Sequence, residues 1–354
     1  MIARRRWIVI VAAVWFACAC DSTSSGSPDA STGPDAPALV DAGADAAPPV
    51  YTPAPFESTY AAHRVLTNRC DRAMNIVGSE PTEPGRYPVA IFLVGTSGIF
   101  DGPGIVDHVL PALTKQGFVA ASLQYENSTL FGAAQNCSLY QDNAECMVRN
   151  DADYVDGERR SAIAQLCGRA KADCSKGVVV LGHSQGGMTA LQTFRFTPAT
   201  PPADEPMPKL VAAAPMGVGA AGYLAGIRVI NLDACMTADT IVADKSKLLI
   251  VNGEHDRYFS VPGVEPAGNQ VPLETVTGRH CAVPSWDCRG ATGDGWVLVQ
   301  PSELTTGLAV HDYMHDHGVD PAAPFAEPNW ISPDTTAPWG LYSTARWLRA
   351  QIPE

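Results

Sequence analysis

One short stretch of the chain has the spacing of a nucleophilic serine. Residues 182–186 read GHSQG, which fits the pattern G-x-S-x-G. A serine hydroxyl attacks a carbonyl carbon once a neighbouring base takes its proton. Such a pattern also arises by chance, and a tight turn with a surface serine is the plain alternative. The context favours chemistry, because an apolar strand pattern over 177–181 precedes the motif and a helical pattern over 185–196 follows it. We predict that Ser184 is a nucleophile.

The sequence resembles the α/β-hydrolases over roughly residues 56–354. The resemblance rests on GHSQGG at 182–187 and on further pieces in the family's order. It implies a mostly parallel sheet with helices on both faces, and a nucleophile followed along the chain by an acid and then a histidine. It also implies a carboxylesterase-like or lipase-like serine hydrolase acting on a small-molecule or polymer ester, with no cofactor and no metal.

The acid of such a site is predicted at Asp256. Residues 247–256 read KLLIVNGEHD, which resembles the family's strand followed by Gly-x-x-Asp. A carboxylate there orients the histidine and stabilises its charged form. Glu254 is a neighbouring competitor, Asp233 follows a poorer strand, and a loop acid that caps Arg257 is the alternative without chemistry.

The histidine has two main candidates. His280 follows a weak strand pattern over 272–277, and GRHCAV at 278–283 resembles the histidine followed closely by a disulfide-bonded cysteine in secreted esterases and polyester hydrolases. His311 competes, because GWVLV at 295–299 is a further strand pattern that would put His311 after the last strand. Weaker candidates are His63, His315 and His317, and His183 is interpreted as a packing residue.

An oxyanion hole requires two backbone N–H groups aimed at the developing charge. The residue after the nucleophile, Gln185, supplies one of them in this fold, and the loop after an earlier strand supplies the other. Residues 95–98, GTSG, form that loop here, and we place the second donor at Thr96. The family's HG-type loop is replaced by Val-Gly at 94–95, and a plain glycine turn is the alternative.

Two other segments carry polar clusters. Residues 311–317 read HDYMHDH, with histidines at the helical metal-ligand spacing of 311 and 315. The chain has no H-E-x-x-H, so a solvated polar loop is expected and no metal site is predicted. Residues 125–156 are polar and irregular, and are interpreted either as part of a lid or substrate wall or as a surface excursion.

The remaining pattern alternates between strands and helices, which predicts a mostly parallel sheet covered on both faces. Strand patterns span 87–94, 117–123, 177–181, 210–214 and 248–251, and helical patterns span 105–115, 158–170, 185–196 and 343–352.

The first 55 residues do not read as folded domain. Residues 1–20 have a basic start and an apolar run of about 11 residues, which is typical of a signal peptide and too short to cross a bilayer. Small residues before Cys20 resemble a bacterial lipoprotein signal, with Cys18 a poorer site and an ordinary secretory signal the alternative. Residues 21–55 are rich in Ala, Asp, Pro and Ser and are predicted to be a disordered linker. Lipid on Cys20 would anchor the protein to a membrane.

Eight cysteines remain after the signal, an even number that suggests disulfides in an exported protein. The spacings favour local pairs: Cys137 with Cys146, Cys167 with Cys174, and Cys281 with Cys288, which leaves Cys70 with Cys235.

Composition limits the function classes. Apolar residues make up 46% of the chain, enough for a large core, and the net charge of −13 repels nucleic acid. The expectation is an exported, monomeric ester hydrolase of the periplasm or cell surface. The alternatives are an exported peptidase or amidase on the same fold, and a non-catalytic surface lipoprotein.

Overall fold

The computed structural model describes residues 49–64, 69–127, 137–148, 161–195, 210–224, 227–241, 244–259, 267–316 and 324–353. The predicted signal peptide with Cys20, and residues 21–48 of the predicted linker, lie outside these ranges.

A nine-stranded sheet forms the centre of the folded unit, in the order β1-β2-β4-β3-β5-β6-β9-β11-β10. The six strands from β4 to β11 run parallel, and the sheet is antiparallel only at its two edges. The parallel strands are apolar and buried on both faces, as their valine-rich and leucine-rich sequences require. The strands are β1 Pro53–Arg64, β2 Arg69–Pro81, β3 Val89–Leu93, β4 Val119–Leu123, β5 Val178–His183, β6 Leu210–Met216, β9 Leu249–Gly253, β10 Asp287–Arg289 and β11 Gly295–Val299, with a separate pair β7 Ala221–Leu224 and β8 Ile227–Asn231.

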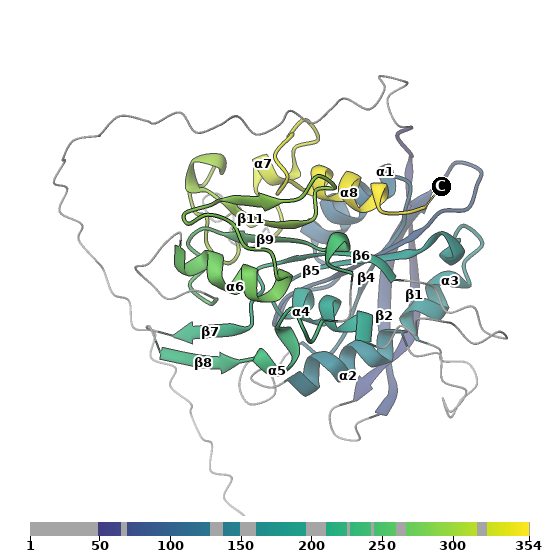
Figure 1. Ribbon diagram of the computed structural model, residues 1–354. Coiled ribbons are helices and arrows are strands. Elements are labelled where there is room, and N and C mark those ends of the chain that lie inside the picture. Colours follow the sequence, from purple (N-terminus) through teal and green to yellow (C-terminus); the bar gives the residue numbers. More distant parts are fainter. Residues whose placement is uncertain are drawn as a thin grey trace, which may run out of the picture. The chain divides into compact units, whose positions relative to one another are not determined.

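Helices cover both faces of the sheet. In Figure 1, α1 and α8 lie together on one face, and α2, α3 and α4 lie on the other. This arrangement confirms the predicted α/β class with a mostly parallel sheet. The helices are α1 Leu110–Lys115, α2 Cys137–Val148, α3 Ala162–Cys167, α4 Gln185–Gln192, α5 Asp233–Met236, α6 Ala267–Thr277, α7 Pro328–Ile331 and α8 Leu341–Ala350, with a π-helical turn at Ile105–Val109 and 3₁₀ turns at Cys174–Lys176, Thr193–Arg195, Lys245–Lys247 and Pro301–Glu303.

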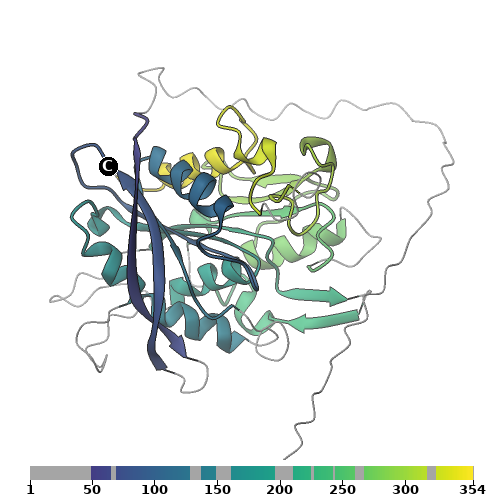
Figure 2. The ribbon, with the colours of Figure 1, turned by 180° about the vertical axis from the view of Figure 1, so that it is seen from behind.

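The sequence patterns did not indicate the long hairpin of β1 and β2. It starts at Pro53, inside the predicted linker, and its two strands run side by side at one edge of the sheet (Figure 2). Alternate residues of β1, such as Glu57 and Thr59, are exposed, and Tyr60 is buried. The guanidinium of Arg169 lies 3.5 Å from the ring centre of Phe56, a cation–π contact that holds the hairpin against the segment after α3.

The predicted strand over residues 272–277 is wrong, because this stretch belongs to helix α6. Gln270, Leu273 and Val276 are fully buried while Val271 is exposed, which is the spacing of one helix face and not the alternation of a strand. The further strand suspected at 295–299 is present as β11 and pairs in parallel with β9.

The described residues contain four disulfides, of which two match the predicted pairs and two do not. Cys167–Cys174 and Cys281–Cys288 are confirmed, whereas the other bonds are Cys70–Cys146 and Cys137–Cys235. The local pair of Cys137 with Cys146 was wrong because both residues lie in α2. Nine residues of helix separate their Cα atoms by about 13 Å along the axis, and a disulfide tolerates at most about 7 Å.

Candidate active site

Ser184 occupies a strained turn between β5 and α4. Its φ of 55° and ψ of −121° lie in a region that side-chain-bearing residues rarely adopt. The turn is tight because helix α4 begins directly behind β3: a Cβ on Gly186 would lie 2.2 Å from the carbonyl oxygen of Leu93. The backbone N–H of Ser184 donates to the carbonyl of Met216 at 2.8 Å, so the neighbouring strand also holds the turn.

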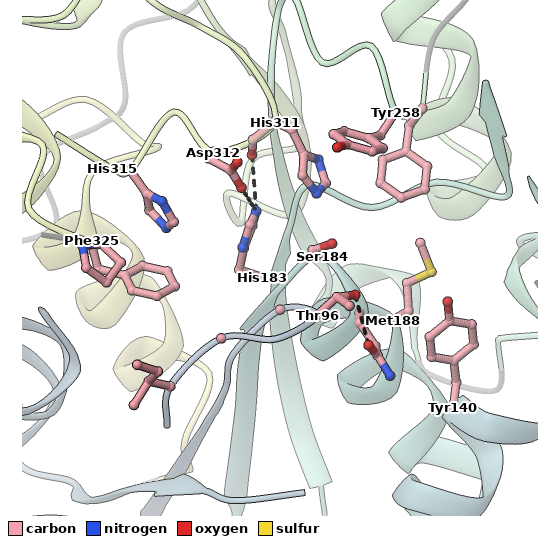
Figure 3. A pocket seen from close by; sticks show the side chains of 16 residues that line it. Thr96, Tyr140, His183, Ser184, Met188, Tyr258, His311, Asp312, His315 and Phe325 are labelled. Carbon is pink, nitrogen blue, oxygen red and sulfur yellow. Dashed lines mark hydrogen bonds and ion pairs between the residues drawn. The ribbon is translucent and has the colours of Figure 1, made fainter. Parts of the chain in front are cut away.

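A pocket of about 300 Å³ opens at the carboxyl ends of the parallel strands, where ligand sites form in open α/β sheets. The segments that follow β3, β5, β9 and β11 all contribute to its wall (Figure 3). The lining residues are Gly95, Thr96, Gly98, Ile99, Tyr140, His183, Ser184, Gln185, Met188, Tyr258, Phe259, His311, Asp312, His315, Pro324 and Phe325.

Asp256 and His311 form a buried pair beside this pocket. Asp256, in the turn after β9, is 1% exposed and accepts a hydrogen bond from the backbone N–H of Tyr258 at 3.0 Å. Its other carboxylate oxygen lies 2.9 Å from Nδ1 of His311. The two segments come together because β9 ends in Gly253, where a Cβ would lie 2.3 Å from the carbonyl of Ala309.

The carboxylate of Asp256 has the strongest effect among the charged neighbours of His311. Burial by itself lowers the pKa of His311, but the charge and hydrogen bond of Asp256, with the charge of Asp312, outweigh it and raise that pKa. When Nδ1 donates its proton to Asp256, Nε2 is left as an acceptor. In Figure 3 the His311 ring and the Ser184 side chain point toward each other.

His280 is placed away from Ser184. Its Nδ1 lies 3.1 Å from Glu274 Oε2 of α6, its side chain is 74% exposed, and it does not line the pocket. The physical reason is the order of elements: α6 replaces the expected last strand, and β11 follows His280 in the chain. The structure thus brings Ser184, Asp256 and His311 together and leaves His280 outside.

The other candidate residues also have definite positions. His63 is buried on β1, with Nε2 3.7 Å from Asp142 Oδ2, and lies outside the pocket lining, whereas His315 is part of that lining. Asp233 begins the short helix α5. His317 lies outside the described residues.

Thr96 and Gln185 are in contact beside the turn that carries Ser184. The Thr96 hydroxyl donates to Gln185 Oε1 at 2.9 Å. In the described part of the chain, the backbone N–H groups of these two residues have no hydrogen-bond acceptor. Both N–H groups are therefore available to an oxygen bound in the pocket.

Asn127 fixes the loop that carries Thr96, a role that no sequence pattern indicated. Its side-chain amide donates to the carbonyls of Gly95 at 2.8 Å and Gly98 at 3.0 Å. The backbone carbonyl of Asn127 accepts from the backbone N–H of Ser97 at 2.9 Å. Ser97 has a φ of 58°, a conformation that these hydrogen bonds help to maintain.

His183 does more than pack beside Ser184. Its Nε2 lies 3.1 Å from the carbonyl oxygen of His311 and 3.3 Å from Asp312 Oδ1. Burial first, and then the nearby His311, lower the pKa of His183 to about 3, so this imidazole is neutral near pH 7. A neutral ring can still donate from Nε2, and it ties the strand before Ser184 to the segment that carries His311.

The expected solvated loop over residues 311–317 is wrong for its described part, since Tyr313 and Met314 are fully buried. Asp312 and His315 flank these two buried residues. A carboxylate oxygen of Asp312, a ring nitrogen of His315 and a ring nitrogen of His183 all lie within 4.8 Å of one another. These three side chains are a group that could hold a metal ion.

The opposite wall of the pocket is mostly apolar. It is formed by Met188 of α4, by Tyr258 and Phe259 after β9, and by Tyr140 of α2. Tyr140 belongs to the segment 125–156, whose interpretation as part of a substrate wall is consistent with this position. Burial raises the pKa of Tyr140 to about 12, so its hydroxyl stays neutral.

Comparisons with known proteins give a distant structural likeness. No family model and no curated protein matches the sequence. Among solved structures, the chain is similar to an S-formylglutathione hydrolase from Agrobacterium tumefaciens, with a TM-score of 0.39 and 12% identity over 63% of this chain and 83% of that chain. A functional assignment for this chain therefore rests on the geometry of its own pocket.

Proposed function

We propose that the protein is an exported serine hydrolase that cleaves carboxylic esters through an acyl-enzyme on Ser184. One observation carries the proposal: His311, whose Nδ1 lies 2.9 Å from the buried carboxylate of Asp256, lines the same pocket as a serine in a strained strand-to-helix turn. Nucleophile, base and orienting acid are the three parts that acyl transfer by serine requires.

In the proposed reaction, His311 Nε2 takes the proton of Ser184 as the hydroxyl oxygen attacks the ester carbonyl. Asp256 keeps the proton of His311 on Nδ1 and stabilises the imidazolium that forms. The negative charge on the tetrahedral intermediate is held by the backbone N–H groups of Thr96 and Gln185. His311 then protonates the leaving alcohol, and the same base activates water to release the acid from Ser184.

The pocket supports a substrate of modest size. A volume of about 300 Å³ is at the small end of ligand sites. The apolar wall of Met188, Phe259 and Tyr140 provides a surface for a short acyl or alkyl chain, and the two N–H donors orient the carbonyl. We therefore expect short-chain esters to react faster than long-chain ones.

The test combines a covalent probe with ester turnover. We expect a fluorophosphonate to label the wild type, and p-nitrophenyl acetate and butyrate to be hydrolysed. Ser184→Ala and His311→Ala should each lose activity by at least about a thousandfold, while His280→Ala, the matched control, keeps it. Thermal melts must show that the variants are folded. A folded wild type that is neither labelled nor active contradicts the proposal, and so does full activity of His311→Ala.

Four disulfides support the exported part of the proposal. Disulfides persist in oxidising compartments and are rare in the cytosol. No helix among the described residues combines the length and apolar character that crossing a bilayer needs. We propose that Cys20 becomes the acylated N-terminus of the mature protein. The intact mass of protein purified from its native membrane tests this, because a mature chain without added acyl mass excludes the lipid.

A further inference from the structure

A polar cluster lies in the pocket on the side away from the apolar wall. It consists of His183, at the end of β5, and of Asp312 and His315, from the segment after β11 (Figure 3). Each of the three offers one ligand atom, and these atoms all lie within 4.8 Å of one another. The proposed ester cleavage assigns no chemical step to any of the three.

The donor set fits one class of metal ion. Two imidazole nitrogens and a carboxylate oxygen are ligands that Zn²⁺ takes readily, and imidazole is a poor match for Mg²⁺ or Ca²⁺. At metal–ligand distances near 2.1 Å, a tetrahedral site holds neighbouring ligand atoms about 3.4 Å apart. His183 Nε2 and Asp312 Oδ1 are already 3.3 Å apart. The His315 nitrogen reaches the same spacing by moving no more than about 1.5 Å, which a side-chain rotation supplies.

Phe325 packs against both imidazoles. Its ring meets His315 edge-on at 4.8 Å between centroids and His183 at 6.0 Å. Phe325 is buried, and its φ of 59° is a strained conformation for a bulky side chain. Strain of this kind persists where the surroundings over-determine it, and it clusters at functional sites. Tyr313 and Met314, buried between Asp312 and His315, fix the backbone that carries those two ligands.

We propose that His183, Asp312 and His315 form a binding site for one Zn²⁺ ion, with a fourth position open to the pocket beside Ser184. Without the ion, the Nε2 proton of His183 is shared between the His311 carbonyl and Asp312. Metal binding displaces this proton, since only a deprotonated ring nitrogen ligates. A water or a substrate oxygen completes the coordination, because all three ligands line the pocket.

Calorimetry with ZnCl₂ tests the site on protein stripped of metal by a chelator and then dialysed. We expect one ion per chain. His315→Ala and the isosteric Asp312→Asn should each weaken binding at least tenfold, because loss of even an outer-shell partner commonly costs 10- to 100-fold in affinity. His280→Ala removes an exposed histidine beside Glu274 and should bind as the wild type does. The eight cysteines of the described chain are in disulfides and offer no competing thiolate.

The outcomes separate this site from the proposed hydrolase. Ser184→Ala abolishes the proposed reaction and should bind Zn²⁺ normally. The zinc site and the proposed ester hydrolysis are therefore tested independently of each other. The site is overturned if the wild type binds no ion, if affinity in His315→Ala or Asp312→Asn stays within threefold of the wild type, or if His280→Ala loses binding as well. Should thermal melts show that His315→Ala is unfolded, the Asp312→Asn titration decides.

Discussion

Nε2 of His183 lies 3.1 Å from the carbonyl oxygen of His311, so the residue before the proposed nucleophile is hydrogen-bonded to the backbone of the proposed base. The contact joins the end of β5 to a segment that lies 128 residues further along the chain. It fixes the position of His311 relative to Ser184 from the backbone side, while Asp256 fixes the ring.

This contact predicts that His183→Phe impairs catalysis by misplacing His311. The aromatic ring keeps most of the buried volume, but the His311 carbonyl loses its donor, which costs about 1–3 kcal/mol of folding stability. We expect kcat to fall by more than tenfold with KM changed little. Denaturant unfolding and steady-state kinetics on the same preparation measure both effects. A variant with reduced stability and an unchanged kcat would show that the contact is structural only.

Backbone strain at Ser184 predicts that removing its side chain stabilises the protein. Glycine adopts a φ of 55° and ψ of −121° without the steric cost that serine or alanine bears. Ser184→Gly should therefore unfold with a free energy about 1 kcal/mol higher than Ser184→Ala, after the greater flexibility of unfolded glycine is allowed for. Both variants are inactive, so chemical denaturation compares them directly. Equal unfolding free energies would mean that the strain at this position is no larger than the flexibility cost of glycine in the unfolded chain.

The raised pKa of His311 predicts how kcat/KM depends on pH. The base must be neutral to act, so kcat/KM should fall as the pH drops through a pKa above the ordinary 6.5. Asp312→Asn removes one of the charges that raise this pKa, and should move the midpoint to lower pH while Asp256 and His311 stay paired. Rate profiles of metal-free wild type and variant test this. A midpoint that does not move would exclude Asp312 as a source of the shift.

The same histidine should make the free energy of unfolding fall as the pH rises, whereas kcat/KM rises. A histidine whose folded pKa is above its unfolded value contributes stability when protonated. The contribution of His311 is fully present below pH 6.5 and is lost as the pH rises through its folded pKa. Asp256→Ala should remove this dependence, which urea unfolding across the pH range can follow. An unchanged pH dependence of stability in Asp256→Ala would contradict the assignment.

Asn127 is predicted to support the oxyanion donors without touching the serine. Asn127→Ala removes both hydrogen bonds to the loop of Gly95 and Gly98 and frees the Thr96 N–H to move. Losing one oxyanion donor outright costs about 100- to 1000-fold in kcat, and a loosened donor should cost at least about tenfold. Labelling by the fluorophosphonate should slow in parallel. An Asn127→Ala enzyme with wild-type kcat would place the second donor elsewhere.

The disulfides that hold α2 are predicted to contribute more stability than the local ones. Cys137–Cys235 closes a loop of 98 residues and Cys167–Cys174 a loop of 7. Chain entropy gives about 4–5 kcal/mol for the long loop and about 2–3 kcal/mol for the short one. Replacing each pair by alanines and measuring unfolding free energies tests the order. Since α2 carries Tyr140 into the pocket, loss of Cys137–Cys235 should also raise KM, whereas loss of Cys167–Cys174 should not.

Local patterns in the sequence were sufficient for the parts of the fold whose partners are close along the chain. The strand, turn and helix around Ser184 could be predicted together, because β5, the turn and α4 form from adjacent residues. Gly253, the last residue of β9, and Asp256 in the turn that follows could be predicted for the same reason. The short disulfides Cys167–Cys174 and Cys281–Cys288 follow equally from local spacing.

Tertiary structure decided everything that depends on which distant segments meet. The stretch 272–277 has enough apolar residues for a strand, and only packing against β11 makes it the helix α6. That choice leaves His280 on the surface and puts His311 beside Asp256. The pairing of Cys70 with Cys146, and the meeting of His183, Asp312 and His315, likewise require segments separated by many tens of residues. Sequence periodicity records which face of an element is buried, but it does not record what that face is buried against.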